Sequence, residues 1–74
     1  METVRWTLET ERRHIAYLRH LIESYDGMAV VRTVDPQQAV IELMIAPGCR
    51  DLIMDLLSYL RNEENIKIHL LTQA

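Results

Sequence analysis

The sequence predicts an α+β fold for a single domain spanning residues 1–74, and three observations carry this prediction. Two stretches near the ends alternate apolar and polar side chains with period two, as a strand with one covered face does. Two others repeat apolar side chains every three or four residues, as an amphipathic helix does. Two β-rich runs, at 28–34 and 40–46, lie between the predicted helices and are folded about Asp35-Pro36.

The first strand is expected over 3–9, and a helix over 11–24 follows it. Thr10 stands where its hydroxyl could accept a hydrogen bond from a free amide of the first helical turn, so it is the expected helix cap. Asp26-Gly27 is expected to end the helix, because glycine tolerates the left-handed conformation that closes many helices.

The central pair of strands is read as a β-hairpin. Pro36 presets φ for the second turn position, and the Asp35 side chain can accept from the backbone beyond it. We expect Val34 to pair with Val40, which leaves the five residues 35–39 in the loop.

This register places Arg32 opposite Glu42 and Val30 opposite Met44 on one face of the hairpin. A shift by one residue would place Arg32 opposite Ile41 and under the helices. A cross-strand ion pair contributes only ~0.2–1 kcal/mol, whereas an unpaired buried charge costs several times more. The free-energy cost of burying Arg32 without a partner therefore decides the register, and the ion pair does not.

Pro47-Gly48 ends the hairpin, and a second helix is expected over 49–62. Its apolar arc is unusually wide, so one side covers the sheet and the remainder needs another cover. A polar turn leads to a last strand over 66–71. The order strand, helix, strand, strand, helix, strand is the ferredoxin-like βαββαβ pattern, with an antiparallel sheet of order 4-1-3-2 and both helices on one face.

Length and composition limit the functions that the chain could have. A chain of 74 residues with 49% hydrophobic residues buries only ~60% of its unfolded surface, so part of its apolar surface is expected at a subunit interface, with a dimer the expected assembly. The net charge is −3 and there is one cysteine. These features, together with the lack of an apolar run of ~20 residues, predict a cytoplasmic domain that binds no nucleic acid and enters no membrane.

The face without helices supplies the candidate interface. RNA-binding domains of this fold present aromatic platforms on the two central strands, and this face has none, which argues against RNA. A second copy could bury its mixed apolar and charged surface, and the alternative is a solvated face. The expected members of the whole face include Thr3, Thr7 and Lys67, and the candidate interface residues are Arg5, Val30, Arg32, Val34, Val40, Glu42, Met44, His69 and Leu71.

Gly48-Cys49-Arg50 is the candidate anion or thiol site, because a helix start and an arginine favour a thiolate. A catalytic thiol would need His14 or His69 as a base. The spacing of Cys49 also places it on the buried face of the second helix, so a small packed side chain is the better interpretation. His14 and His20 lie ~240° apart around a helix. We therefore expect no metal site, no cofactor and no enzymatic activity.

The chain resembles ACT-like ferredoxin-fold regulatory domains, and small stand-alone bacterial domains of unknown function, through its element order over residues 3–71 and its run at 26–31. The ACT-like resemblance implies dimers that bind small, amino-acid-type ligands. The loop Glu9-Thr10-Glu11 lacks the family's usual glycine, so no binding residue is carried over. Two hypotheses remain. One is an interaction or regulatory module that self-associates through its open sheet face, an edge strand or the wide second helix and could also meet a protein partner. The other is a small-molecule sensor with its ligand at a subunit interface.

Overall fold

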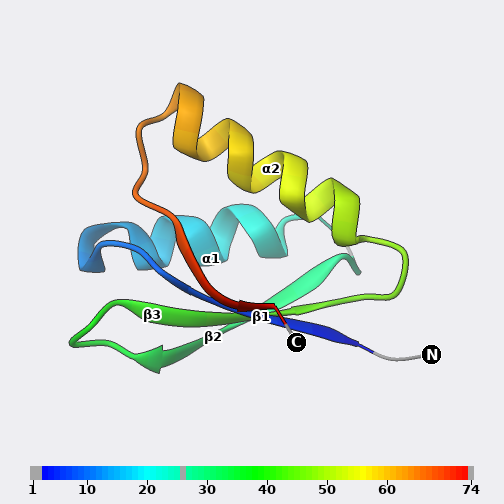
Figure 1. The fold of residues 1–74 in the computed structure, drawn as a ribbon, viewed down its shortest axis with the longest axis horizontal. Helices are drawn as coiled ribbons and strands as arrows, with labels where there is room; N and C mark the ends of the chain where they lie inside the picture. Colours follow the sequence, from blue (N-terminus) through cyan, green and yellow to red (C-terminus); the bar gives the residue numbers. More distant parts are fainter. Residues whose placement is uncertain (1–2, 26, 74) are drawn as a thin grey trace.

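The computed structural model describes residues 3–25 and 27–73 and has the ferredoxin-like order. The elements are β1 (Val4–Glu9), a 3₁₀ turn η1 (Arg12–His14), α1 (Ile15–Glu23), β2 (Ala29–Asp35), β3 (Val40–Ile45), α2 (Arg50–Glu63) and β4 (His69–Gln73). All neighbouring strands are antiparallel, in the sheet order β2-β3-β1-β4, which is the predicted order read from the other edge. Both helices lie on the same side of the sheet (Figure 1).

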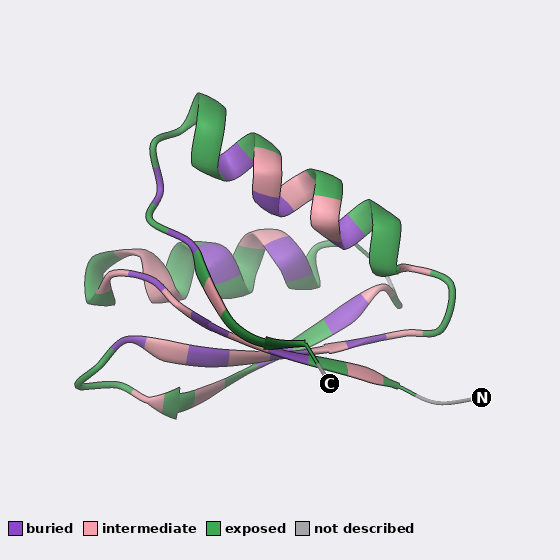
Figure 2. Ribbon diagram, in the orientation of Figure 1, coloured by how far each residue is buried: buried purple, intermediate pink, exposed green. Residues whose placement is uncertain are grey.

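The hydrophobic core lies between the sheet and the two helices, as the burial colours in Figure 2 make visible. Alternate residues of each central strand point into it because side chains in a strand change face at every residue. Apolar residues at three- and four-residue spacing supply the helical side. The fully buried large side chains are Trp6, Leu8, Leu18, Ile22, Ile41, Leu43, Ile45, Ile53, Leu57 and Leu60.

The register of the hairpin is confirmed along most of its length. Arg32 pairs with Glu42 and Val30 with Met44, as the cost of burying an arginine predicted. The predicted pair Val34–Val40 is wrong. Asp35 pairs with Val40 instead, and Val34 is an extra residue where the register shifts.

The turn explains this shift. The Asp35 carboxylate accepts hydrogen bonds from the backbone amides of Gln37 and Gln38, at 2.9 and 3.2 Å. The turn therefore begins at Asp35 itself, and four residues rather than five separate it from Val40. Ala39 closes the turn with φ of +56°, a conformation that costs a non-glycine residue ~1–2 kcal/mol.

Thr10 is not the helix cap that the sequence predicted. The period-two alternation of β1 continues for one more residue, which brings Thr10 to the buried side. Its amide donates to the carbonyl of Ala39 at 2.9 Å, and its hydroxyl has no hydrogen-bond partner among the described residues. Glu11 occupies the cap position without a side-chain hydrogen bond, and the predicted helix over 11–24 begins as η1.

The other boundaries shift by a few residues. Gly27 has φ of +73°, the left-handed conformation expected of it, and Gly48 adopts a positive φ of +85° as well. Asp26 lies outside the described residues. The last strand begins at His69 rather than at Ile66, because the end of β1 at Glu9 pairs with His69 and offers the preceding residues no partner. Ile66 and Ile68 are nevertheless buried.

Candidate interaction surface

One face of the sheet carries no helix, and we call it the open face. Most predicted members on β1, β2 and β3 keep their places in the ladders; for example, Arg5 pairs with Met44 and Thr7 with Glu42. Val34 and Leu71 are extra residues at register shifts, and Lys67 precedes β4. Glu9, which pairs with Val40, belongs here too and was missing from the predicted surface, although the alternation of β1 contains the signal. The open face comprises Arg5, Thr7, Glu9, Val30, Arg32, Val34, Val40, Glu42, Met44, Lys67, His69, Leu71 and Thr72, of which Thr72 pairs with Thr7.

The charges of the open face are largely paired within the chain. The Arg32 guanidinium lies 3.2 Å from the Glu42 carboxylate, which is itself mostly buried. The Lys67 ammonium lies 3.6 Å from a Glu9 carboxylate oxygen, and His69 Nδ1 lies 3.9 Å from the same oxygen. The pairs place opposite charges side by side, so the face as a whole has little net charge.

Aliphatic side chains are exposed around these pairs. Val30 is 54% exposed, Val34 47% and Leu71 46%. Val34 and Leu71 both lie at register shifts, on β2 and β4 respectively, so each is an extra residue opposite a regular strand. The face thus combines exposed aliphatic groups with internally paired charges.

The edge of the sheet at β2 is covered by side chains of α1. The Glu23 carboxylate accepts a hydrogen bond from the Val31 amide at 2.9 Å, and Arg19 donates to the Thr33 hydroxyl at 3.0 Å. Because an edge strand presents unpaired amides and carbonyls, such contacts obstruct the addition of another strand. At the other edge, the bulge at Leu71 interrupts the regular ladder of β4.

A second exposed apolar surface lies on the helical layer. It includes Tyr17 and Tyr25 of the α1 side and Leu52 and Tyr59 of α2. The Tyr17 hydroxyl donates a hydrogen bond of 2.8 Å to Glu64. This bond is the main reason the pKa of Tyr17 is raised above its usual value, followed by burial and the charge of Glu64.

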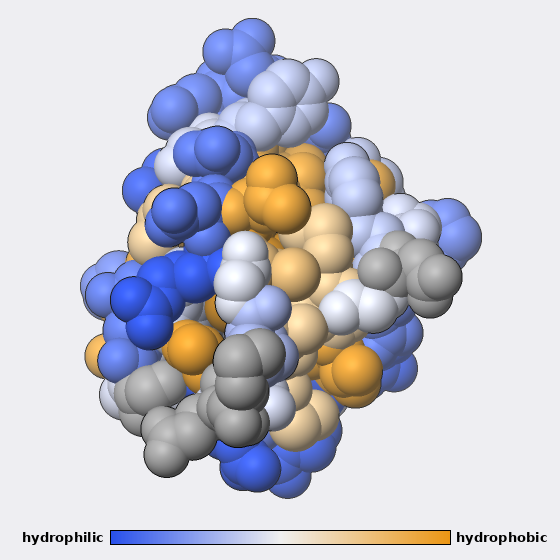
Figure 3. Space-filling view, turned by 90° about the vertical axis from the view of Figure 1, so that its right-hand side faces the viewer, coloured by the Kyte–Doolittle hydropathy of each residue, from blue (hydrophilic) through white to orange (hydrophobic). Residues whose placement is uncertain are grey.

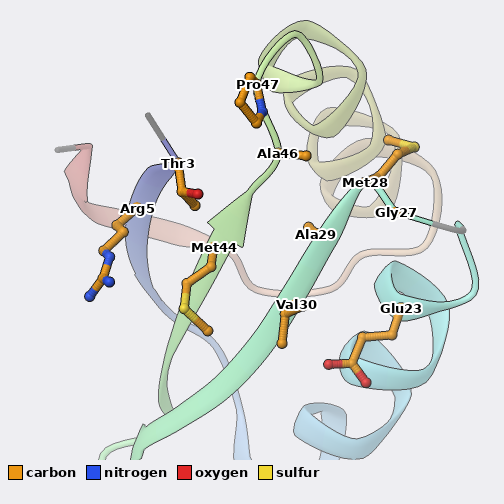
Figure 4. A pocket seen from close by; sticks show the side chains of 10 residues that line it. All are labelled: Thr3, Arg5, Glu23, Gly27, Met28, Ala29, Val30, Met44, Ala46 and Pro47. Carbon is orange, nitrogen blue, oxygen red and sulfur yellow. The ribbon is translucent and has the colours of Figure 1, made fainter. Parts of the chain in front are cut away.

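A hollow of about 630 Å³ lies where the open face meets the α1–β2 and β3–α2 loops. A smaller hollow adjoins α2, and Met28 lines both of them. Figure 3 shows the corresponding end of the molecule, where apolar side chains form a band between hydrophilic flanks. Figure 4 shows the larger hollow and its ten lining residues: Thr3, Arg5, Glu23, Gly27, Met28, Ala29, Val30, Met44, Ala46 and Pro47.

The candidate site at Gly48-Cys49-Arg50 is placed at the start of α2. The Cys49 amide, which an anion would need, already donates to the carbonyl of Ala46 at 3.1 Å. Its side chain is half-buried and packs against the hydrophobic core, while Arg50 is exposed. The three residues therefore adjoin in sequence without forming a pocket of their own among the described pockets.

The histidines do not gather. His14 lies beside Glu11 at the start of α1, with 3.6 Å between Nδ1 and the carboxylate, whereas His69 lies beside Glu9 on the sheet. Within residues 3–25 and 27–73, no group of three or more histidine, cysteine, aspartate or glutamate side chains is placed to hold a metal ion. Nor does that part of the chain contain a helix long and apolar enough to cross a membrane.

Comparison with known proteins gave one family. Neither the curated proteins nor the solved structures yielded a match, so the ACT-like resemblance stays a prediction. The profile of a family described as a domain of unknown function (DUF4911) matches residues 8–63, from the end of β1 to the end of α2. The match confirms the predicted likeness to small domains of unknown function, and the chain belongs to this family.

Proposed function

We propose that the domain is a non-enzymatic interaction and regulatory module of the cytoplasm that forms a homodimer through its open face. The observation that carries the proposal is the exposure of Val30, Val34 and Leu71 on a sheet face that no helix covers. Burial of apolar surface is the main favourable term in protein association. A second copy would remove these aliphatic groups from water.

The charges on the open face favour binding of a second copy of the chain over binding of a strongly charged partner. A lone charge buried at an interface costs several kcal/mol, because it leaves water without a compensating partner. Arg32 and Lys67 already have carboxylates within 4.0 Å, on Glu42 and Glu9. The face can therefore meet an identical face with Arg32 and Lys67 already paired, whereas Arg5, which has no carboxylate within 4.0 Å among the described residues, would need a partner from the second copy or a bound anion.

The size of the face suits a small dimer. The molecule measures 32 × 25 × 19 Å along its principal axes, and Figure 1, drawn down the shortest axis, shows the sheet below the helices and nearly on edge. The whole molecule projects at most about 600 Å² on that side, so the open face is smaller than the ~800 Å² per partner of a standard interface and suits a weak dimer.

Both edges of the sheet are obstructed, which favours the open face as the dimer interface. Addition of a strand at β2 would have to displace Glu23 from the Val31 amide and would meet Arg19. Addition at β4 would meet the bulge at Leu71. Bulges and covered edges are the means by which proteins prevent edge pairing.

Sedimentation equilibrium tests this proposal, with variants in matched pairs. Val34→Lys places a charge on the open face, and Leu52→Lys makes the same change at a comparably exposed position on α2. Arg32→Glu breaks the Arg32–Glu42 pair, and Arg61→Glu makes the same charge change on α2. We expect a wild-type dimer, dissociation constants raised at least about tenfold in the open-face variants, which is ~1.4 kcal/mol, and unchanged values in the α2 variants.

Thermal unfolding of each variant must accompany these measurements, so that loss of the fold is not read as loss of the dimer. A wild-type protein that sediments as a monomer at all concentrations would contradict the proposal. So would a dimer that dissociates on Leu52→Lys and persists on Val34→Lys, because the interface would then lie on the helices.

A second candidate function, small-molecule sensing, is favoured by the hollow at the border of the open face. Its volume of about 630 Å³ lies within the ~300–1,000 Å³ of ligand sites, which combine apolar walls with a few polar groups. A thermal-shift screen of amino acids and nucleotides tests this candidate, and at least one stabilising ligand is expected.

A further inference from the structure

The hollow at the border of the open face has walls of two chemical kinds. Its floor and one end are apolar and include Met28, Val30, Met44 and Pro47. In Figure 4 the side chains of Arg5 and Glu23 lie on opposite sides, with those of Met44 and Val30 between them. Methionine side chains are flexible and polarisable, so they adapt to apolar groups of different shapes.

The two charged walls are not equivalent. The Glu23 carboxylate already has a partner within the chain, because one of its oxygens accepts the hydrogen bond from the Val31 amide. Its negative charge remains and repels an anion on that side. Arg5 has no carboxylate within 4.0 Å and no side-chain hydrogen bond among the described residues. Figure 4 shows its side chain on the β1 side of the hollow with the guanidinium turned outward. Arg5 is therefore an exposed lining cation that can turn toward a bound anion.

We infer that this hollow binds a small molecule with an apolar body and a single carboxylate, the carboxylate meeting Arg5 and the body lying over Met44 and Val30. Arginine is suited to this role because its planar fork of donors matches the two oxygens of a carboxylate. Glu23 fixes the direction of the ligand, since the reversed orientation would bring two carboxylates together.

The inference rests on the proposed dimer in one respect. Arg5, Val30 and Met44 belong to both the open face and the lining of the hollow. A second copy on the open face would close the hollow on its open side and bury the ligand body further. Ligand binding and dimerisation then strengthen each other by the same factor, as linkage requires.

Octanoate is a suitable probe below its micellar concentration, with 1-octanol and suberate as comparisons. Amide chemical shifts in a titration should move around Met28, Val30 and Met44 and give a dissociation constant. We expect octanoate to bind about tenfold more tightly than either comparison, because 1-octanol lacks the charge that meets Arg5 and suberate places a second carboxylate near Glu23. Equal affinity for octanoate and 1-octanol would overturn the inference.

Variants assign the contact to Arg5. Arg5→Gln should weaken octanoate binding about tenfold and leave 1-octanol within about twofold. Arg61→Gln, which removes an exposed arginine of α2 outside the hollow, should change neither. If Arg5→Gln and Arg61→Gln bind octanoate equally well, Arg5 is not the anion contact and the inference fails.

Val34→Lys separates this inference from the proposed dimer, because Val34 belongs to the open face but does not line the hollow. In this variant octanoate should still shift the signals of the hollow, with weaker affinity. In the wild type, octanoate should lower the dimer dissociation constant. A monomeric wild-type protein that binds octanoate would refute the dimer alone, whereas a dimer that octanoate weakens or leaves unchanged would refute the coupled site.

Discussion

Tyr17 shows how one contact between distant residues sets a proton equilibrium. Its hydroxyl donates to Glu64, which follows α2 and lies 47 positions later in the chain. The bond holds the proton on the phenol, and the negative charge of Glu64 disfavours the phenolate, so the pKa of Tyr17 is raised from 10.0. Nothing in the sequence pattern of either helix indicates this pair.

The raised pKa of Tyr17 predicts a loss of stability at alkaline pH. A group whose pKa is higher in the folded state stabilises fully below its unfolded pKa near 10, and this contribution is lost as pH rises through the folded pKa. In Glu64→Ala, NMR titration of Tyr17 should give a pKa closer to 10.0, and the stability should fall less steeply above about pH 10. Glu63→Ala makes the same charge change one residue earlier, and an equal shift there would argue against the hydrogen bond as the main cause.

At the level of elements, α1 acts on the sheet in two ways. Its buried residues Leu18 and Ile22 pack into the core, while Glu23 and Arg19 reach the edge of β2. The contact of Glu23 is partly buried, and a hydrogen bond to a charged group contributes about 1.5–3 kcal/mol, less where water replaces the lost partner. The helix thus stabilises the strand and covers its edge at once.

Glu23→Ala should therefore lower the free energy of unfolding by about 1–2 kcal/mol in urea denaturation. Glu23→Gln keeps an acceptor and should retain most of the stability. The direct measurement is amide exchange at Val31, which should become faster in the alanine variant and change little in the glutamine variant. Unchanged exchange at Val31 in Glu23→Ala would exclude the proposed role of the contact.

At the level of the whole molecule, the apolar surface is divided between a buried core and two exposed areas. The open face and the outer side of the helices each present large apolar side chains. A chain of 74 residues leaves ~40% of its unfolded surface exposed. Its stability is therefore expected to depend on assembly.

If the dimer stabilises the fold, Tm must rise with protein concentration, because unfolding then includes dissociation. For a domain of this size we expect an increase of about 3–5 °C per tenfold concentration. Differential scanning calorimetry of the wild type and of Val34→Lys measures it, and over the same concentrations the Tm of the variant should be lower and should rise less than that of the wild type. A wild-type Tm independent of concentration would contradict the dimer.

Much of the fold followed from local patterns. The wrong predictions occurred where a side chain could take either of two structural roles. Arg32 and Glu42 were paired correctly because burying an arginine under the helices is too costly. Asp35 was correctly expected to accept from the turn backbone, yet Asp35 itself pairs with Val40, so the loop starts one residue later and Val34 is left as an extra residue in the ladder. Thr10 has the chemistry of a cap, but the alternation of β1 takes it into the interior.

The candidate surface was predicted less completely than the fold. The alternation of the strands indicated the members of the open face, because period two assigns every residue to one side. The hollow could not be predicted, since its lining comes from β1, β2, β3 and the end of α1, and only the folded chain brings Arg5 and Glu23 to its two sides.

The sequence by itself determined the α+β class, the order of the elements and the face of each strand that enters the core. These are properties of neighbouring residues, because periodicity, glycine and proline act over a few positions. Tertiary structure alone decided which edge is covered, where the hollow lies and which hydroxyl donates to Glu64. Each of these depends on side chains brought together from distant positions, whose contacts local pattern does not encode.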